Sequence, residues 1–88
     1  MTKGKTGTGF EYEISKNIIN DYELVENLGM LDENPLILGT VVKQILGKGQ
    51  ANKLKDHVRN KEGIVGIDSM TKEIIDIFKN SGEETKNS

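Results

Sequence analysis

The pattern of apolar and polar residues changes from strand-like to helical near the N-terminus. Phe10, Tyr12 and Ile14 alternate with acidic residues, which is the two-residue period of a β-strand. Residues 1–9 before them are polar and rich in glycine, and we expect these residues to form a disordered arm. The strand-like segment should then pack on helices, and it should pair with a second chain or with residues 64–67.

Two helices are predicted between residues 20 and 47. The first helix can begin at Asn20 or Asp21, because either side chain can cap a helix N-terminus. Its apolar stripe consists of Leu24, Val25, Leu28 and Leu31. The second helix can begin with Asn34 as its N-cap and Pro35 at its first position. It should end at Gly47, where a left-handed C-cap residue is expected.

Two further helices complete the predicted fold. Residues 49–60 have a weaker apolar stripe, with basic residues outside it, that consists of Ala51, Leu54 and Val58. A turn and the short extended segment 64–67 lead to the last helix, which Asp68 should cap. The apolar face of that helix consists of Met70, Ile74, Ile77 and Phe78. We therefore expect a mainly α fold: four short helices in a compact bundle, with a short N-terminal β-like segment and flexible termini.

The length of 88 residues predicts one small domain. We expect this domain to span residues 10–80, between the disordered arm and a polar, disordered tail over residues 81–88. A chain of this size buries only somewhat more than ~60% of its unfolded surface, and its core has no Trp, two Phe and two Tyr. Association with copies of itself or with a partner would therefore add stability.

The second predicted helix carries more apolar surface than a short helix normally hides. Apolar residues occupy positions 36, 37, 38, 41, 42, 45 and 46, which cover more than half of the helix circumference. Such a helix either lies at the centre of the core or has part of its surface covered by another molecule. The candidate partner-binding residues, which could equally all belong to the core, are Leu36, Leu38, Val42 and Ile45.

Charge is unevenly distributed along the chain, although the net charge is only −2. Residues 10–34 carry seven acidic residues and one basic residue, whereas residues 43–61 carry six basic residues and one acidic residue. Two interpretations are open: solvated helix faces, or complementary surfaces used in assembly. No apolar run approaches the ~20 residues that cross a membrane, and the start does not resemble a signal peptide. We expect a soluble, intracellular protein.

The sequence offers little for catalysis or for metal binding. Cysteine is absent, which excludes disulfides and thiolate chemistry. His57 has no partner at metal-ligand spacing, so we expect it to pack at the surface or at the core boundary. The GKT run at residues 4–6 lacks the earlier glycine and the strand that a phosphate-binding loop requires. Glu23 and Glu26 are typical of an exposed helix face rather than of a catalytic pair. We expect a non-enzymatic protein without cofactors or metal ions.

A small helix–turn–helix regulator of prophage or bacterial origin is the main alternative. Residues 35–46, the GKG turn and residues 50–60 could form a bihelical DNA reader, with Lys53, Lys55 and Arg59 near phosphates. A single arginine is poor for guanine recognition, however, and the acidic N-terminal segment would repel the DNA backbone. We therefore expect no nucleic-acid partner. A third interpretation is an adaptor for a partner of unknown kind.

The predicted elements follow one another in a recognisable order. FEYEI precedes an acidic helix, DYELVENLGMLDENPL, which is followed by an apolar helix ending in ILGKGQ and then by LKDHVRNKEGIVGIDSMTKEIIDIF. This order resembles the small tail assembly chaperones of long-tailed bacteriophages and prophages of Gram-positive bacteria. Those proteins show an FEFEI-like start before D-ELLE-L, DNPL, LLG-EQ, L--HLR-EDGRVP and a final I-EIF helix. The match runs from Phe10 to Phe78. The chain departs from the family pattern at two positions. Gly49 replaces the acidic residue that usually follows the lysine, and Gly66 replaces a common proline. These departures affect the expected starts of the third and fourth helices.

The resemblance implies a non-enzymatic binding protein. Chaperones of this family coat the long helical tape-measure protein, keep it soluble and help to recruit tail-tube subunits, and they are absent from the finished virion. The implied partners are the tape-measure protein and the tail-tube protein, and the implied location is the cytoplasm of the host bacterium. Self-association is also implied, and head-to-tail stacking of the acidic and basic segments would fit it. A groove beside the second helix would then bind the amphipathic tape-measure helix.

Overall fold

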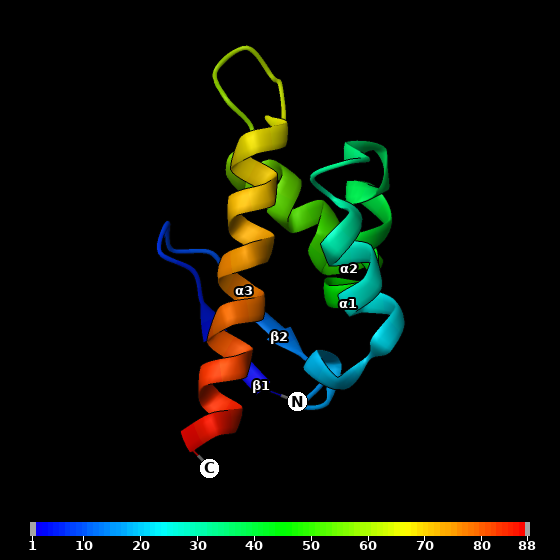
Figure 1. Cartoon of the computed structure of the whole chain (residues 1–88). Helices are drawn as coiled ribbons and strands as arrows, with labels where there is room; N and C mark the ends of the chain where they lie inside the picture. Colours follow the sequence, from blue (N-terminus) through cyan, green and yellow to red (C-terminus); the bar gives the residue numbers. More distant parts are fainter. Residues whose placement is uncertain (1, 88) are drawn as a thin grey trace.

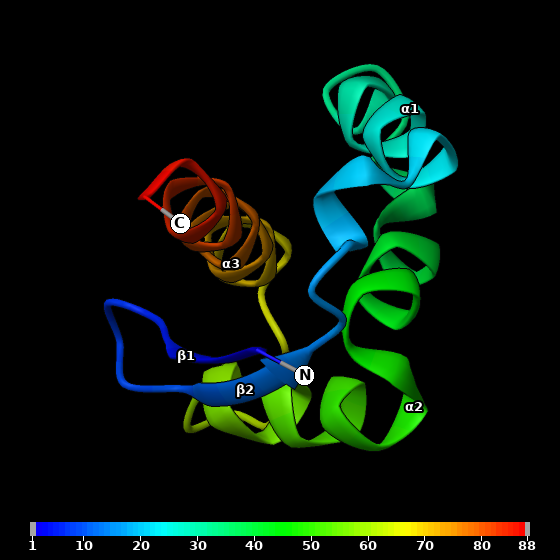
Figure 2. The same cartoon turned by 90° about the horizontal axis from the view of Figure 1, so that it is seen from below.

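Within residues 2–87, the structure has three α-helices and a small antiparallel hairpin, which packs against the second and third of these helices (Figure 1). The computed structural model describes the backbone of residues 2–87 and the side chains of residues 2–18 and 20–80. The elements in chain order are β1 (Thr2–Lys5), β2 (Glu11–Ile14), the 3-10 turn η1 (Ile18–Asn20), α1 (Tyr22–Met30), the 3-10 turn η2 (Pro35–Ile37), α2 (Leu38–Val58) and α3 (Ile67–Asn87). The hairpin lies between α3 and the C-terminal half of α2 (Figure 2).

The prediction of a four-helix bundle is wrong. Among the described residues there are three α-helices and a two-stranded sheet, because the second and third predicted helices are one element, α2. This helix bends sharply at Gly47, whose backbone is not helical (φ 78°, ψ 164°) (Figure 2). That combination of angles is open to glycine and to almost no other residue. The predicted break of the helical backbone at Gly47 is therefore present, but it lies inside α2 as a kink between two helical segments.

The predicted disordered arm is also wrong for the residues that the structure describes. Thr2–Lys5 form β1, which pairs antiparallel with β2 and places Gly4 opposite Tyr12. The strand paired with β2 is therefore β1, whereas Val65 of the segment 64–67 forms a bridge with Arg59. The turn between the strands closes with a bond from the Thr6 N–H to the Phe10 C=O (2.9 Å). Gly9 supplies the positive φ (95°) that this three-residue type of hairpin loop requires. Met1 lies outside the described residues.

The pairing of β1 with β2 has a clear side-chain basis. Lys3 stands opposite Glu13, and Lys5 stands opposite Glu11, so both exposed cross-strand pairs join opposite charges. On the other face, Gly4 leaves room for the ring of Tyr12, which a methyl group at that position would overlap. The hairpin thus has an outer face on which opposite charges stand across from each other, and an inner face with the buried side chains of Tyr12 and Ile14.

The loop between α2 and α3 repeats the hairpin turn. The N–H of Asn60 donates to the C=O of Ile64 (2.9 Å), and Gly63 takes a positive φ (85°), as Gly9 does in the first turn. The Asn60 side chain also accepts from the N–H groups of Glu62 and Ile64. This tight loop sets the start of α3 close to the end of α2.

The predicted helix starts are partly correct. Asp21 caps α1 by accepting from the N–H groups of Glu23 and Leu24 (3.0 and 3.3 Å). Asn34 also acts as an N-cap, with Pro35 following it, but the first turn there is the 3-10 turn η2. The prediction for Asp68 is wrong, because α3 already begins at Ile67 and Asp68 lies in its first turn. The helix continues through residues 81–87, which we expected to form a disordered tail, and residue 88 lies outside the described residues.

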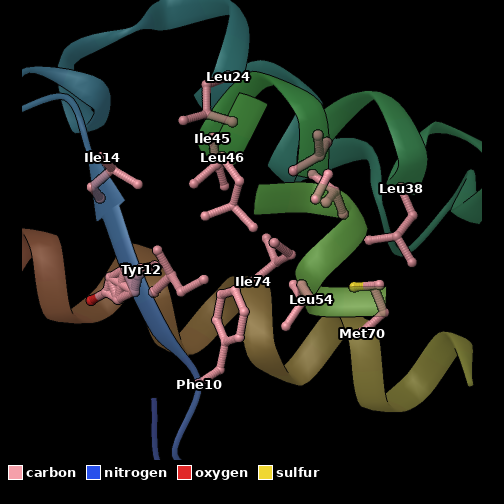
Figure 3. Close-up of a cluster of buried hydrophobic side chains, with 14 residues drawn as sticks. Phe10, Tyr12, Ile14, Leu24, Leu38, Ile45, Leu46, Leu54, Met70 and Ile74 are labelled. Carbon is pink, nitrogen blue, oxygen red and sulfur yellow. The ribbon is translucent and has the colours of Figure 1, made fainter. Parts of the chain in front are cut away.

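A single core joins the hairpin and all three helices (Figure 3). Its fully buried residues include Ile14 from β2, Leu24 from α1, Leu54 from α2 and Ile74 from α3. The predicted apolar faces of the strand and of the last helix are confirmed by their burial. Val25 is the exception among the predicted stripes, since 44% of its surface is exposed.

Candidate functional site

The four candidate partner-binding residues have two different environments. Leu38, Val42 and Ile45 are buried, with 8%, 4% and 4% of their surfaces exposed, and all three belong to the core. Leu36 is almost fully exposed, at 91%. It is the second residue of η2 and precedes the helix that carries the other three. The apolar surface of the second predicted helix is therefore mostly internal, and only one of the four candidates is open to a partner in full.

A shallow apolar groove lies between α2 and the start of α3, and we call it the α2–α3 groove. Its volume is about 260 Å³. Its lining residues, which are apolar except for two glycines and two lysines, are Leu38, Gly39, Val42, Lys43, Ala51, Lys55, Val65, Gly66, Ile67 and Met70. Two of the candidate residues, Leu38 and Val42, thus contribute their small exposed surfaces to this groove.

The bend in α2 is what builds the groove. Lys43 lies before the bend at Gly47 and Lys55 lies after it, yet both line the same small hollow. In a straight helix, twelve residues would separate them by about 18 Å along the axis. Figure 3 shows Leu38 of α2 and Met70 of α3 at the same end of the core, where they form the floor of the groove. A packed floor of this kind holds its shape without a ligand.

A second hollow of about 360 Å³ continues from the α2–α3 groove, and we call it the adjoining hollow. Leu38 and Ile67 line both spaces, and 62% of the Ile67 surface is exposed between them. The charged residues of the adjoining hollow are Asp32, Asp68 and Lys72. The continuous depression is therefore basic beside α2 and mixed in charge beside the start of α3. Sequence analysis missed Ile67, because it lay in a segment read as an extended link.

Another partly apolar surface lies on α1. Tyr22, Val25 and Met30 are exposed there, next to the acidic residues Glu23 and Glu26. The expectation that these two acids lie on an exposed helix face is confirmed. The acidic face of α1 and the basic groove between α2 and α3 are thus two separate surfaces of opposite charge.

A buried polar cluster fixes the hairpin turn to α3. Thr6 and Glu73 are 5% and 4% exposed, and the Thr6 hydroxyl donates to Glu73 Oε1 (2.8 Å). The Thr8 hydroxyl donates to Glu73 Oε2 (2.9 Å), and the Gly7 N–H donates to Asp76 Oδ2 (2.7 Å). The threonine of the GKT run and the threonine of the following turn thus bind the same carboxylate of α3, that of Glu73. No pattern near in sequence could have found this contact, because 67 residues separate Thr6 from Glu73.

The same cluster also includes His57. The Thr8 hydroxyl, which donates to Glu73 Oε2, lies 3.0 Å from His57 Nε2. The prediction that His57 packs at the surface or boundary is confirmed, since it is exposed and its ring lies 5.5 Å from that of Phe10.

Gln50 is a structural residue that sequence analysis missed. Its side-chain amide accepts from the N–H of Glu13 (2.7 Å) and donates to the C=O of Glu13 (2.6 Å). It also donates to the C=O of Leu46 (2.9 Å), which lies just before the bend in α2. The amide thus occupies the outer edge of β2 as a neighbouring strand would, and it ties the hairpin to the bend.

The basic segment of α2 is less suited to DNA than its charge implies. Arg59, the one arginine of the chain, donates from Nη1 to the C=O of Gly63 (2.9 Å) and lies 3.4 Å from Asp56 through Nη2. The guanidinium therefore supports the loop before α3. A bidentate contact to guanine would require it to leave both partners.

The described residues contain neither a metal-binding cluster nor a membrane-spanning helix. There, His, Asp and Glu side chains form no group of three or more that is placed to hold a metal ion. None of the helices in that part of the chain combines the length and the apolar character needed to cross a bilayer. No protein-family model, curated protein or solved structure matches the chain.

Proposed function

We propose that this protein is a non-enzymatic tail assembly chaperone that binds an amphipathic helix of a tape-measure protein in the α2–α3 groove. The groove is the observation that carries the proposal. It has a preformed apolar floor and an exposed apolar rim residue, Ile67, which together fit the apolar stripe of a helix. Covering that stripe would keep a long, aggregation-prone helix soluble, and tail-tube subunits would later displace the chaperone.

The identity of the partner comes from the order of sequence features between Phe10 and Phe78. Several of the quoted motifs contain residues that cap helices or bind the backbone in this structure. Their order therefore reflects specific contacts as well as the spacing of apolar residues. The aspartate of DYELVE caps α1, the NPL segment begins η2, and the glutamine of ILGKGQ binds the backbone of β2. The same proposal places the protein in the host cytoplasm and leaves it out of the mature virion.

Self-association is the second part of the proposal. The acidic, partly apolar face of α1 and the exposed basic residues of α2 outside the groove, Lys48 and Lys53, are complementary in charge, which favours head-to-tail contact between copies. Contact of this kind is weakened by salt. Sedimentation at high concentration and low salt should therefore show oligomers. A strict monomer under those conditions would exclude stacking and leave binding to the tape-measure protein as a separate question.

Co-expression with the tape-measure protein tests the main proposal. The chain should raise the soluble fraction of that protein, and Ile67→Asp should abolish the effect, because it places a charge at the rim of the groove. The matched control is Ile75→Asp, since Ile75 is also an exposed isoleucine of α3 but lines neither hollow. Equal solubility with and without the chain would contradict the proposal, as would a loss of the effect in both variants to the same degree.

A gel-shift at low salt separates this function from the helix–turn–helix alternative. We expect no sequence-selective complex with DNA. Sequence-selective binding that is lost when Lys53 and Lys55 are changed to glutamate would contradict the chaperone proposal in favour of a DNA-binding regulator.

A further inference from the structure

The size of the α2–α3 groove limits what it can hold. Its 260 Å³ is below the ~300–1,000 Å³ that is usual for sites of small organic ligands. Its floor is formed by side chains that are already packed in the core, such as Leu38 and Met70. An occupant can therefore insert only one or two apolar side chains, and the rest of its contact must lie along the rim. Protruding side chains on one face of a helix meet this description.

The charged residues at the rim of the groove favour helices with some charge patterns over helices with others. Lys43 and Lys55 are exposed, and neither forms an ion pair with another described side chain. Of the residues that the structure describes, they are the charged ones that line the α2–α3 groove. The adjoining hollow, reached past Ile67, contains Asp32, Asp68 and Lys72. The depression therefore has a basic end and an end where acidic side chains outnumber basic ones.

We propose that the α2–α3 groove selects helical segments whose apolar anchor residues are flanked by acidic side chains, and that Lys43 and Lys55 form ion pairs with those acidic side chains. The inference rests on the proposed function, because it specifies the chemistry of the tape-measure segment that the groove accepts. Charge complementarity carries it: acidic residues beside the anchors would meet the two lysines, whereas basic residues at the same positions would be repelled. The mixed end of the depression would orient the segment, with its uncharged or basic end toward Asp32 and Asp68.

Two labelled helical peptides with one apolar stripe test this selectivity on the full chain. One peptide carries glutamates beside the stripe, and the other carries lysines at the same positions. Fluorescence anisotropy should show that the acidic peptide binds about tenfold more tightly at low salt, as expected for two rim charge pairs. The preference should shrink as salt is added, because exposed charges are screened.

Paired lysine variants make the test specific to the groove. Lys43→Glu/Lys55→Glu should reverse the preference, so that the basic peptide binds more tightly. The control Lys48→Glu/Lys53→Glu changes the net charge equally on the same helix but at positions outside both hollows, and it should keep the original preference. All four lysines are exposed, so folding should survive, and circular dichroism checks it.

The possible results separate the inference from the proposed function. Equal binding of both peptides, or the same shift in both double variants, would overturn the charge selectivity. If the chain nevertheless solubilises the tape-measure protein, the proposed function stands without it. Competition between the acidic peptide and self-association would show that a second copy, through its acidic α1 face, occupies the groove. That result would also overturn the inference of a separate acidic partner.

Discussion

Replacing Thr6 with valine tests whether the hairpin is held by its buried contact with α3. Valine has nearly the shape of threonine, so the substitution removes the hydroxyl while leaving the packing almost intact. That hydroxyl donates to Glu73 Oε1 (2.8 Å) and accepts from the N–H of Phe10 (3.1 Å). Both Thr6 and Glu73 are at least nine-tenths buried, so water cannot easily replace the lost partner.

The expected loss of stability follows from these two bonds. A hydrogen bond to a charged group contributes about 1.5–3 kcal/mol, and one to a neutral group contributes about 0.5–1.5 kcal/mol. The greater apolar character of valine offsets part of this loss, so the free energy of unfolding should fall by about 2–4 kcal/mol. A domain of this size has only about 4–13 kcal/mol of stability in total. The melting temperature should therefore fall by about 8–30 °C.

Urea and thermal unfolding followed by far-UV circular dichroism give the free energy directly. The matched control is Thr8→Val in the same turn, because Thr8 also donates to Glu73 but is an exposed residue. Because Thr8 is exposed, water can solvate the groups that lose its hydroxyl as a partner. The free energy of unfolding of this control should therefore fall by less than about 1 kcal/mol. A Thr6→Val protein within about 0.5 kcal/mol of the parent, or equal losses in both variants, would refute the reasoning.

Three further predictions concern the backbone of the hairpin and of α2. Gly4→Ala should destabilise the protein by about 1–3 kcal/mol in urea unfolding, because the new methyl group would overlap the ring of Tyr12, and an unchanged midpoint would contradict this packing. Gly47→Ala should cost about 1–3 kcal/mol, because its positive φ and extended ψ suit glycine alone, and a stabilised variant would mean that α2 can run straight. Gln50→Ala should cost about 1 kcal/mol and speed hydrogen exchange at the Glu13 amide, and unaltered exchange would show that this bond is not formed in solution.

Local signals in the sequence predicted much of the helical structure correctly. Asp21 and Asn34 cap where expected, because capping needs only a side chain and the backbone two or three residues later. The position of Gly47 was predicted as a break for the same kind of reason. Apolar spacing likewise predicted which faces of β2 and α3 are buried. These features depend on residues within a turn or two of each other.

The features that were missed depend on residues far apart in the chain. Residues 2–5 lack an apolar period, and β1 leads into a turn that Thr6 ties to Glu73, 67 residues further along the chain. Gln50 behaves as part of a sheet edge, although it lies on a helix. The groove has the same origin: Leu38 and Val42 were found from apolar spacing, whereas Ile67 became part of the site only through the loop that precedes α3. The periodicity of a single sequence carries no information about contacts between residues that lie far apart in the chain.

The burial of the groove floor has a consequence for how the protein would bind. Leu38 and Val42 are more than nine-tenths covered before any partner arrives, so a partner can remove little additional apolar surface from water there. The exposed side chain of Ile67 and the stems of the two lysines supply most of what remains. Each contact should therefore be weak and readily reversed. A protein that coats a long helix with many copies gains its overall strength from the repetition of such contacts. Weak individual contacts would also let tail-tube subunits displace the copies one at a time, which a deep and tight pocket would prevent.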